Sequence, residues 1–227
     1  MTASERPEPA GLVDALRREL EPTEQAIRSH PYLQALEEGR VSEQALRSFA
    51  GEQYWTLSSD RRAFAQLAAR FPSPPAGDFF LSLAAGEGEA LGRLFAFARV
   101  LEVDERELAR YEPLPGAHAY TAFVAWLALN GSRTDVALAF LVNLPAWGAN
   151  CVRMAAALRG RLGLSDADVA FFDFFATPPA DFEQQALAVV AAGLRSGDAP
   201  EPARRAAHLL QAYELMYWDT LARGLEG

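Results

Sequence analysis

The sequence has 227 residues, of which half are hydrophobic and 22% are charged, as is typical of a globular chain that buries a large core. Its net charge is −9 and all 21 basic residues are arginine, which argues against a nucleic-acid-binding surface and excludes mechanisms that need a lysine. The one cysteine, Cys151, excludes an intrachain disulfide and fits a reducing compartment.

The amino-terminal third of the chain predicts two helices. We expect residues 1–10 to be a flexible N-terminus and residues 11–227 to form a single helical domain. Leucines at four-residue spacing predict a first helix over residues 12–27, and Pro31 is interpreted as a break after it. Ser42 then predicts the N-cap of a second helix that continues to about residue 71.

The rest of the chain repeats this pattern. Ser132 and Asp135 form a capping box for a long helix that is apolar on all sides. Ser165 and Asp168 repeat the capping-box spacing. The other helices are expected over residues 77–100, 117–129, about 180–194 and 203–225. The prediction is an all-α bundle of about seven to eight helices without strands.

No segment is expected to cross a membrane, because the longest apolar stretches are interrupted by Asn, Pro or Gly. The polar, acidic N-terminus does not resemble a signal peptide. We therefore expect a cytoplasmic protein with no membrane partner and no direct nucleic-acid partner.

The helix predicted over residues 42–71 carries polar residues within its apolar face. At 100° per residue, Gln53 and Asp60 lie in the same arc as the buried leucines and phenylalanines, with Thr56 near its edge. Burying such groups costs free energy unless they are paired or used. Asp60 is either part of a functional pocket or half of a structural ion pair with an arginine.

The central helix has a similar polar stripe. Asn143 and Asn150 lie on one face, seven residues apart, with Trp147 between them, and Pro145 leaves the carbonyl of Leu141 without its helical donor. The stripe predicts one wall of a pocket. The alternative is that the two amides only bridge neighbouring helices.

Glu214 lies among apolar residues of the last helix, beside Tyr213, Tyr217 and Trp218. Desolvation raises the pKa of such a carboxyl group, which suits a general acid or base near neutral pH. The alternative is a structural carboxylate paired with an arginine.

No metal or cofactor is expected. The three histidines are scattered and form no His-x₃-His or Glu-x₂-His pair. Cys151 lies on the apolar helix, where a cysteine behaves as a small inert hydrophobe.

Three segments, in order along the chain, resemble the TenA/PqqC family. The opening of TenA-type proteins resembles two segments here, His30-Pro31-Tyr32-Leu33-Gln34 and Gln53-Tyr54-Trp55-Thr56-Leu57. Their Leu-Pro-Cys-Tyr segment resembles Leu144-Pro145-Ala146-Trp147. Their Tyr-Glu-x-x-Phe-Trp ending resembles Tyr213-Glu214-Leu215-Met216-Tyr217-Trp218. The resemblance implies a heme-oxygenase-like helical bundle, thiamin-related chemistry (thiaminase II), and assembly as a homodimer or homotetramer. TenA-type proteins are also described as transcriptional regulators.

The family's site residues are only partly kept. The C-terminal glutamate is kept as Glu214, but the nucleophilic cysteine falls on Ala146, the aspartate on Gln53 and a tyrosine on Thr56. A sister branch holds two iron ions, but its third ligand cluster falls on Phe175, Pro179 and Phe182, which cannot bind iron. The implied chemistry therefore lacks both the covalent step and the metal.

The sequence thus predicts an enclosed pocket for a small, planar heterocyclic ligand. We expect Glu214 and Asp60 to be its catalytic groups, and we expect the ligand-binding residues to be Gln53, Thr56, Asn143, Trp147, Asn150, Tyr213 and Tyr217. One alternative is a metal-independent hydrolase of thiamin-related aminopyrimidines that uses Glu214 as acid and base. A second is a regulatory protein that acts through a metabolite or a protein partner.

Overall fold

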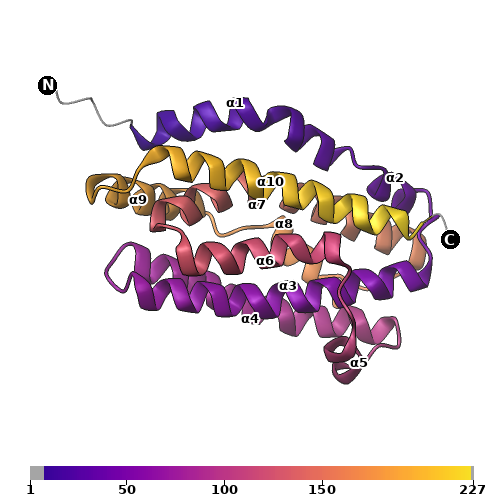
Figure 1. Cartoon of the computed structure of the whole chain (residues 1–227). Coiled ribbons are helices and arrows are strands. Elements are labelled where there is room, and N and C mark those ends of the chain that lie inside the picture. Colours follow the sequence, from indigo (N-terminus) through magenta and orange to yellow (C-terminus); the bar gives the residue numbers. More distant parts are fainter. Residues whose placement is uncertain (1–7, 226–227) are drawn as a thin grey trace, which may run out of the picture.

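The structure, a computed structural model, describes residues 8–225, and this part of the chain folds into ten helices with no strand (Figure 1). The all-α prediction is confirmed. The helices are α1 (Pro9–Arg28), α2 (Pro31–Glu37), α3 (Glu43–Arg70), α4 (Ala76–Val100), α5 (Glu105–Arg110), α6 (Pro115–Asn130), α7 (Arg133–Leu162), α8 (Ala170–Ala176), α9 (Phe182–Arg195) and α10 (Pro200–Arg223).

Two short helices, α2 and α5, account for the difference from the expected seven to eight. Pro31 begins α2 instead of only ending the preceding helix, because the first turn of a helix needs no N–H from that position. The side chain of His30 caps α2 by accepting a hydrogen bond from the Tyr32 N–H at 3.2 Å. A capping box between Asp104 and Glu107 begins α5.

The start of the domain also differs slightly from the prediction. Helix α1 begins at Pro9, so residues 9 and 10 are helical, whereas the flexible segment was expected to extend to residue 10. Residues 1–7 of that expected segment lie outside the described residues.

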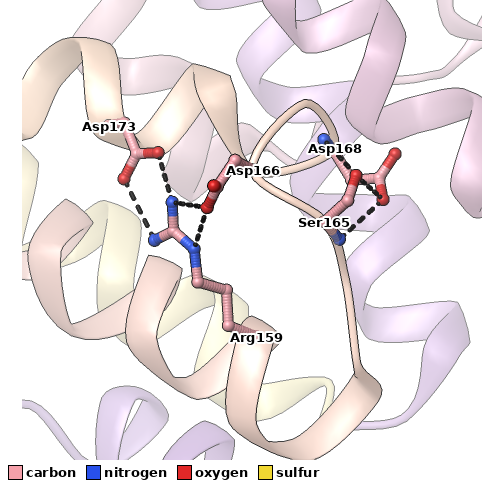
Figure 2. A network of polar contacts seen from close by, with 5 residues as sticks. All are labelled: Arg159, Ser165, Asp166, Asp168 and Asp173. Atoms are coloured by element: carbon pink, nitrogen blue, oxygen red, sulfur yellow. Dashed lines mark hydrogen bonds and ion pairs between the residues drawn. The ribbon is translucent and has the colours of Figure 1, made fainter.

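The two predicted capping boxes have different outcomes. Ser132 and Asp135 form one at the start of α7, as predicted. Ser165 and Asp168 also bond to each other, but they stabilise a turn in the loop before α8, which begins only at Ala170 (Figure 2). In the same loop region Arg159 of α7 binds Asp173 of α8 at 2.6 Å and Asp166 at 2.8 Å. These contacts fix the position of α8 against α7.

The long helices lie side by side, and α7 occupies the middle of the bundle (Figure 1). It packs against α1, α2, α8, α9 and α10, while α3 packs mainly against α4 and α6. By length and composition α7 is apolar enough to cross a membrane, which the sequence prediction did not anticipate, but 72% of that apolar window is buried inside the protein. Burial by neighbouring helices explains why α7 has no polar side.

The core consists of two apolar clusters, one toward each end of the long helices. The first contains Phe64, Phe80 and Phe140 and the second contains Phe49 and Phe97, each with many aliphatic neighbours. Besides α1, five helices contribute to both clusters, namely α3, α4, α6, α7 and α10. The stretch between the two clusters on these helices is where the polar residues lie.

Candidate functional site

A layer of polar side chains separates the two apolar clusters. Each of the five helices contributes to it between its residues in one cluster and its residues in the other. The contributors are Asp60 on α3, Glu87 on α4, Tyr120 and Thr121 on α6, Asn143 on α7, and Gln211 and Glu214 on α10. Polar groups from five helices at one level of a core are costly unless they serve a purpose beyond packing.

This layer surrounds a cavity of about 50 Å³, which is room for a few water molecules, so a ring-sized ligand requires the lining side chains to move apart. Aromatic and aliphatic side chains form its walls and three carboxyl groups lie among them. The lining residues are Gln53, Thr56, Leu57, Asp60, Glu87, Tyr120, Phe140, Asn143, Leu144, Trp147, Phe175, Glu214 and Tyr217. The lining contains no arginine and no histidine.

Asn143 connects the groups on one side of this cavity. Its side-chain amide donates to Glu214 and, at 3.0 Å, to Gln211, and its carbonyl oxygen accepts from the Tyr120 hydroxyl at 3.2 Å. Trp218 donates its indole N–H to the other oxygen of Glu214 at 3.3 Å. The hydrogen bonds therefore hold the Glu214 carboxyl group in one orientation.

The Glu214 carboxyl group is buried without a cationic partner, and no ion pair in the described chain includes it. Burial raises its pKa to about 7, although the hydrogen bonds from Trp218 and Asn143 act in the opposite direction. The arginine-paired alternative is therefore not what the structure shows. Near neutral pH this group exchanges a proton readily.

Asp60 and Glu87 form a second acidic group, on the α3–α4 side of the cavity. Asp60 is 3% exposed, and its Oδ1 atom is buried without a hydrogen-bond partner. Burial raises the pKa of Asp60 well above its usual range, and the neighbouring Glu87 carboxyl raises it further. Burial also raises the pKa of Glu87 to about 8. Neither carboxyl pairs with an arginine among the residues described, so the ion-pair alternative for Asp60 is not met.

The remaining polar contacts of the lining fix the side chains of α3. Gln53 donates to the hydroxyl oxygen of Tyr217 at 2.7 Å, and Thr56 and Thr121 share a hydrogen bond of 3.0 Å. These bonds join α3 to α10 and to α6.

Aromatic rings form another part of the cavity wall. The Trp147 ring meets those of Phe175 and Tyr217 nearly edge-on, with centroids 5.9 and 6.3 Å apart, and tilts against Trp218 at 5.7 Å. Phe175 belongs to α8, which the Arg159 contacts hold in place.

The family model described as the TENA/THI-4/PQQC family matches residues 17–188 of this chain. The chain belongs to this family. A search of curated proteins found no match.

Solved structures of other proteins have the same fold as this chain. A TenA homologue from P. horikoshii OT3 is 18% identical with a TM-score of 0.75, over 94% of this chain and 99% of that one. A TenA homologue from Pseudomonas syringae pv. tomato is 13% identical with a TM-score of 0.77, over 97% and 98%. Heme oxygenase-1 from Synechocystis, solved with heme, is 15% identical with a TM-score of 0.68, over 94% and 93%. The predicted heme-oxygenase-like fold is confirmed.

Within this TenA-family chain, seven of the nine expected site residues line the cavity and two do not. Asn150 lies seven residues beyond Asn143, which is about 10 Å along the helix axis. There its amide donates to the carbonyl oxygen of Ile27, at the end of α1, at 3.2 Å. Tyr213 is 100° around α10 from Glu214, so its ring faces α6 and packs on Phe123 at 5.2 Å.

The position that corresponds to the TenA cysteine nucleophile is apolar here. Ala146 is fully buried within the second apolar cluster, and so is Cys151. Burial raises the pKa of the Cys151 thiol well above its usual range, so the reactive thiolate is disfavoured. Neither residue belongs to the cavity lining. Over residues 8–225, no group of three or more His, Cys, Asp or Glu side chains is arranged to hold a metal ion.

Glu87 and Tyr120 are the lining residues of chemical interest that the sequence analysis missed. Glu87 follows the apolar spacing Leu83, Glu87, Ala90, Leu94, so the test that singled out Asp60 could have found it. Tyr120 carries no comparable signal, because a tyrosine in an apolar stripe is ordinary.

Proposed function

We propose that this TenA-family chain binds a small, planar, positively charged nitrogen compound in the cavity and does so without a cysteine nucleophile. The observation that carries this proposal is the charge of the lining, which combines Asp60, Glu87 and Glu214 with no basic side chain. A cation is the occupant that these groups are suited to bind.

The energetics of the empty cavity support a cationic ligand. A buried carboxylate without a partner is strongly disfavoured, and the raised pKa values of the three groups express that cost. A bound cation supplies the missing charge, so part of the lost free energy is recovered in the complex. The unpaired carboxylates do not stabilise the fold, and their role is to bind the cation.

The shape and the ring content of the walls favour a flat ligand. Trp147, Tyr217, Phe140 and Phe175 present aromatic surface to the cavity. Aromatic faces attract cations, and they pack well against planar rings. Glu214, held by Asn143 and Trp218, is placed to accept a hydrogen bond from an N–H group of such a ring.

Benzamidine and benzamide test this proposal, because they have nearly the same shape and only benzamidine is a cation. We expect benzamidine to raise the melting temperature of the full chain and benzamide to leave it unchanged. In calorimetry, Glu214→Gln weakens benzamidine binding by about tenfold or more, because one charge-assisted hydrogen bond is lost.

The matched control is Glu201→Gln, which removes an exposed acid from the same helix. This variant keeps the affinity of the wild-type chain. Equal binding of benzamide and benzamidine, or an equal loss in both variants, contradicts the proposal.

A second candidate is a metal-independent hydrolase of thiamin-related aminopyrimidines. It is favoured by the pKa of about 7 of the buried Glu214, which matches a general acid or base at neutral pH. A structural neighbour from Sulfolobus solfataricus, 11% identical, is described as a putative TenA-like thiaminase. Steady turnover of an aminopyrimidine that Glu214→Gln abolishes and Glu201→Gln preserves establishes this activity. Binding without turnover excludes it.

A further inference from the structure

The acidic groups of the cavity fall into two sets that come from different helices. Glu214 belongs to α10 and is bonded to Asn143 and Trp218. Asp60 and Glu87 belong to α3 and α4, which pack against each other, and they interact with one another electrostatically. Glu214 is not among the groups that influence Asp60. The cavity therefore has one acid that is fully hydrogen-bonded and a separate acidic pair.

Nothing in the described part of the fold compensates the pair. Asp60 is 97% buried, its Oδ1 atom has no partner, and it lines the cavity. The charged group that acts on its carboxyl, Glu87, has the same sign. Packing does not account for two acids of like charge beside one cavity, and a bound cation would offset their charge.

Tyr120 completes the set of acceptors. Tyr120 also lines the cavity. Burial raises the pKa of its hydroxyl, and the charges of Asp60, Glu214 and Glu87 raise it further. Its proton is donated to Asn143, so its oxygen retains a lone pair that can accept a hydrogen bond.

We propose that Asp60 and Glu87, together with the Tyr120 oxygen, form a second cation subsite that takes a primary ammonium group. The proposal rests on the proposed function, because the same ligand is held at Glu214 by its other basic nitrogen. The ligand class is accordingly a compact dication, a planar unit with basic nitrogen atoms on two sides.

An ammonium group fits these residues better than a metal ion. It has three N–H donors for the three acceptors. Calcium or magnesium ions require about six oxygen ligands, and residues 8–225 provide no cluster of three acidic, His or Cys side chains for a metal. The aromatic rings of Phe140 and Tyr120 in the lining also suit an organic cation.

The test compares 1,4-bis(aminomethyl)benzene with 4-ethylbenzylamine, which replaces one aminomethyl group with an ethyl group of similar shape. Calorimetry uses the full-length chain, Asp60→Asn, Glu87→Gln and the control Glu89→Gln, which changes an exposed acid of α4. We expect the wild type and the control to bind the diamine about tenfold more tightly than the monoamine. In Asp60→Asn and Glu87→Gln this preference falls to about twofold or less, because diamine affinity falls more than monoamine affinity.

Folding of the variants is checked by thermal melting. Because each substitution removes an uncompensated buried acid, both variants are expected to melt at or above the wild-type temperature at pH 8, and a clear loss of stability in both contradicts the unpaired state of these acids. Equal affinity for diamine and monoamine in the wild type overturns the subsite. So does a magnesium- or calcium-dependent rise in melting temperature that both variants abolish. If benzamidine binds through Glu214 while the diamine gains nothing, only the subsite fails; if no cation binds, the proposed function fails as well.

Discussion

The Glu214 carboxyl group is buried at the centre of the bundle with hydrogen bonds from an amide and an indole but no cation. Its pKa is raised from 4.5 to about 7, so the folded protein holds this proton more tightly than the unfolded chain does. The stability associated with the protonated group is complete below pH 4.5 and is lost as the pH rises toward 7. The total loss is about 3 kcal/mol, taking about 1.4 kcal/mol per pKa unit.

This linkage gives a prediction for Glu214→Gln. Since glutamine does not ionise, the free energy of unfolding of the variant falls less between pH 5 and pH 8 than that of the wild type, by on the order of 2–3 kcal/mol. Urea unfolding at several pH values measures it. Absolute stability drops by about 1 kcal/mol at pH 5, because the single oxygen of the new amide cannot accept from both the Trp218 indole and the Asn143 amide. Identical pH profiles for wild type and variant show that Glu214 is not buried as an acid.

The sequence predicted most of the individual residues of the candidate site. Gln53, Asp60 and Asn143 were recognisable because each interrupts an apolar stripe, and each does line the cavity. Asn150 met the same criterion but lies about 10 Å beyond Asn143 along the axis of α7. The angle of a residue around the helix does not reveal this distance. Periodicity gives the face of a helix on which a residue lies, and it does not give the level at which neighbouring helices meet.

At the scale of the elements, the loop before α6 is anchored on α3. Glu52 accepts hydrogen bonds from the Tyr111 hydroxyl at 2.8 Å and from the Leu114 N–H at 2.7 Å, and Trp55 donates to the carbonyl oxygen of Tyr111 at 2.8 Å. The ring of Tyr111 lies directly against Gly51. This anchor sets where α6 begins and hence where Tyr120 enters the cavity.

Gly51→Ala is expected to disturb this anchor. A Cβ at Gly51 would lie 2.6 Å from the Cδ1 atom of Tyr111, so the ring must move and the free energy of unfolding falls by about 1–3 kcal/mol. Gly92→Ala in α4 is the matched control, because its Cβ meets nothing within 4 Å and alanine favours the helix by about 0.5–1 kcal/mol. Chemical denaturation measures both. Equal effects of the two substitutions contradict close packing of Tyr111 on α3.

Proline explains where the sequence analysis misjudged the elements. Pro31 was interpreted as a break, yet it occupies the first turn of α2, as Pro115 occupies the first turn of α6. The same residue ends one helix and begins the next, and only the conformation of the following residues decides between the two. The short helix α5 has a clear capping box but lacks the length that makes a periodic pattern visible.

At the scale of the whole molecule, the functional feature is a polar layer between two apolar cores. Five of the helices that span both clusters supply polar residues to the layer, and the sequence separates these residues by tens of positions. Their alignment depends on how far each helix is displaced along its neighbours, which is set by side-chain packing and loop length. The apolar stripe of α4 could have singled out Glu87, but no feature of the sequence shows that it meets the same cavity as Asp60 and Glu214.

The outer face of α6 carries a prediction for assembly, in line with the expected homodimer or homotetramer. The helix has no charged residue in 16, and its exposed side presents Trp126 at 54% and Leu129 at 65% exposure. A groove beside Trp126 continues onto α10 and is lined by both Asp135 and Arg205, whose opposite charges suit a surface that pairs with a second copy of itself.

Trp126→Glu places a charge in this apolar contact and is expected to raise the dissociation constant at least about tenfold. Light scattering after size-exclusion chromatography then reports the 24.7 kDa monomer at concentrations where the wild type is a multiple of that mass. Leu81→Glu, at a 57% exposed site on α4, leaves the assembly intact. A monomeric wild type, or an assembly unaffected by Trp126→Glu, shows that copies of the chain do not meet through this face.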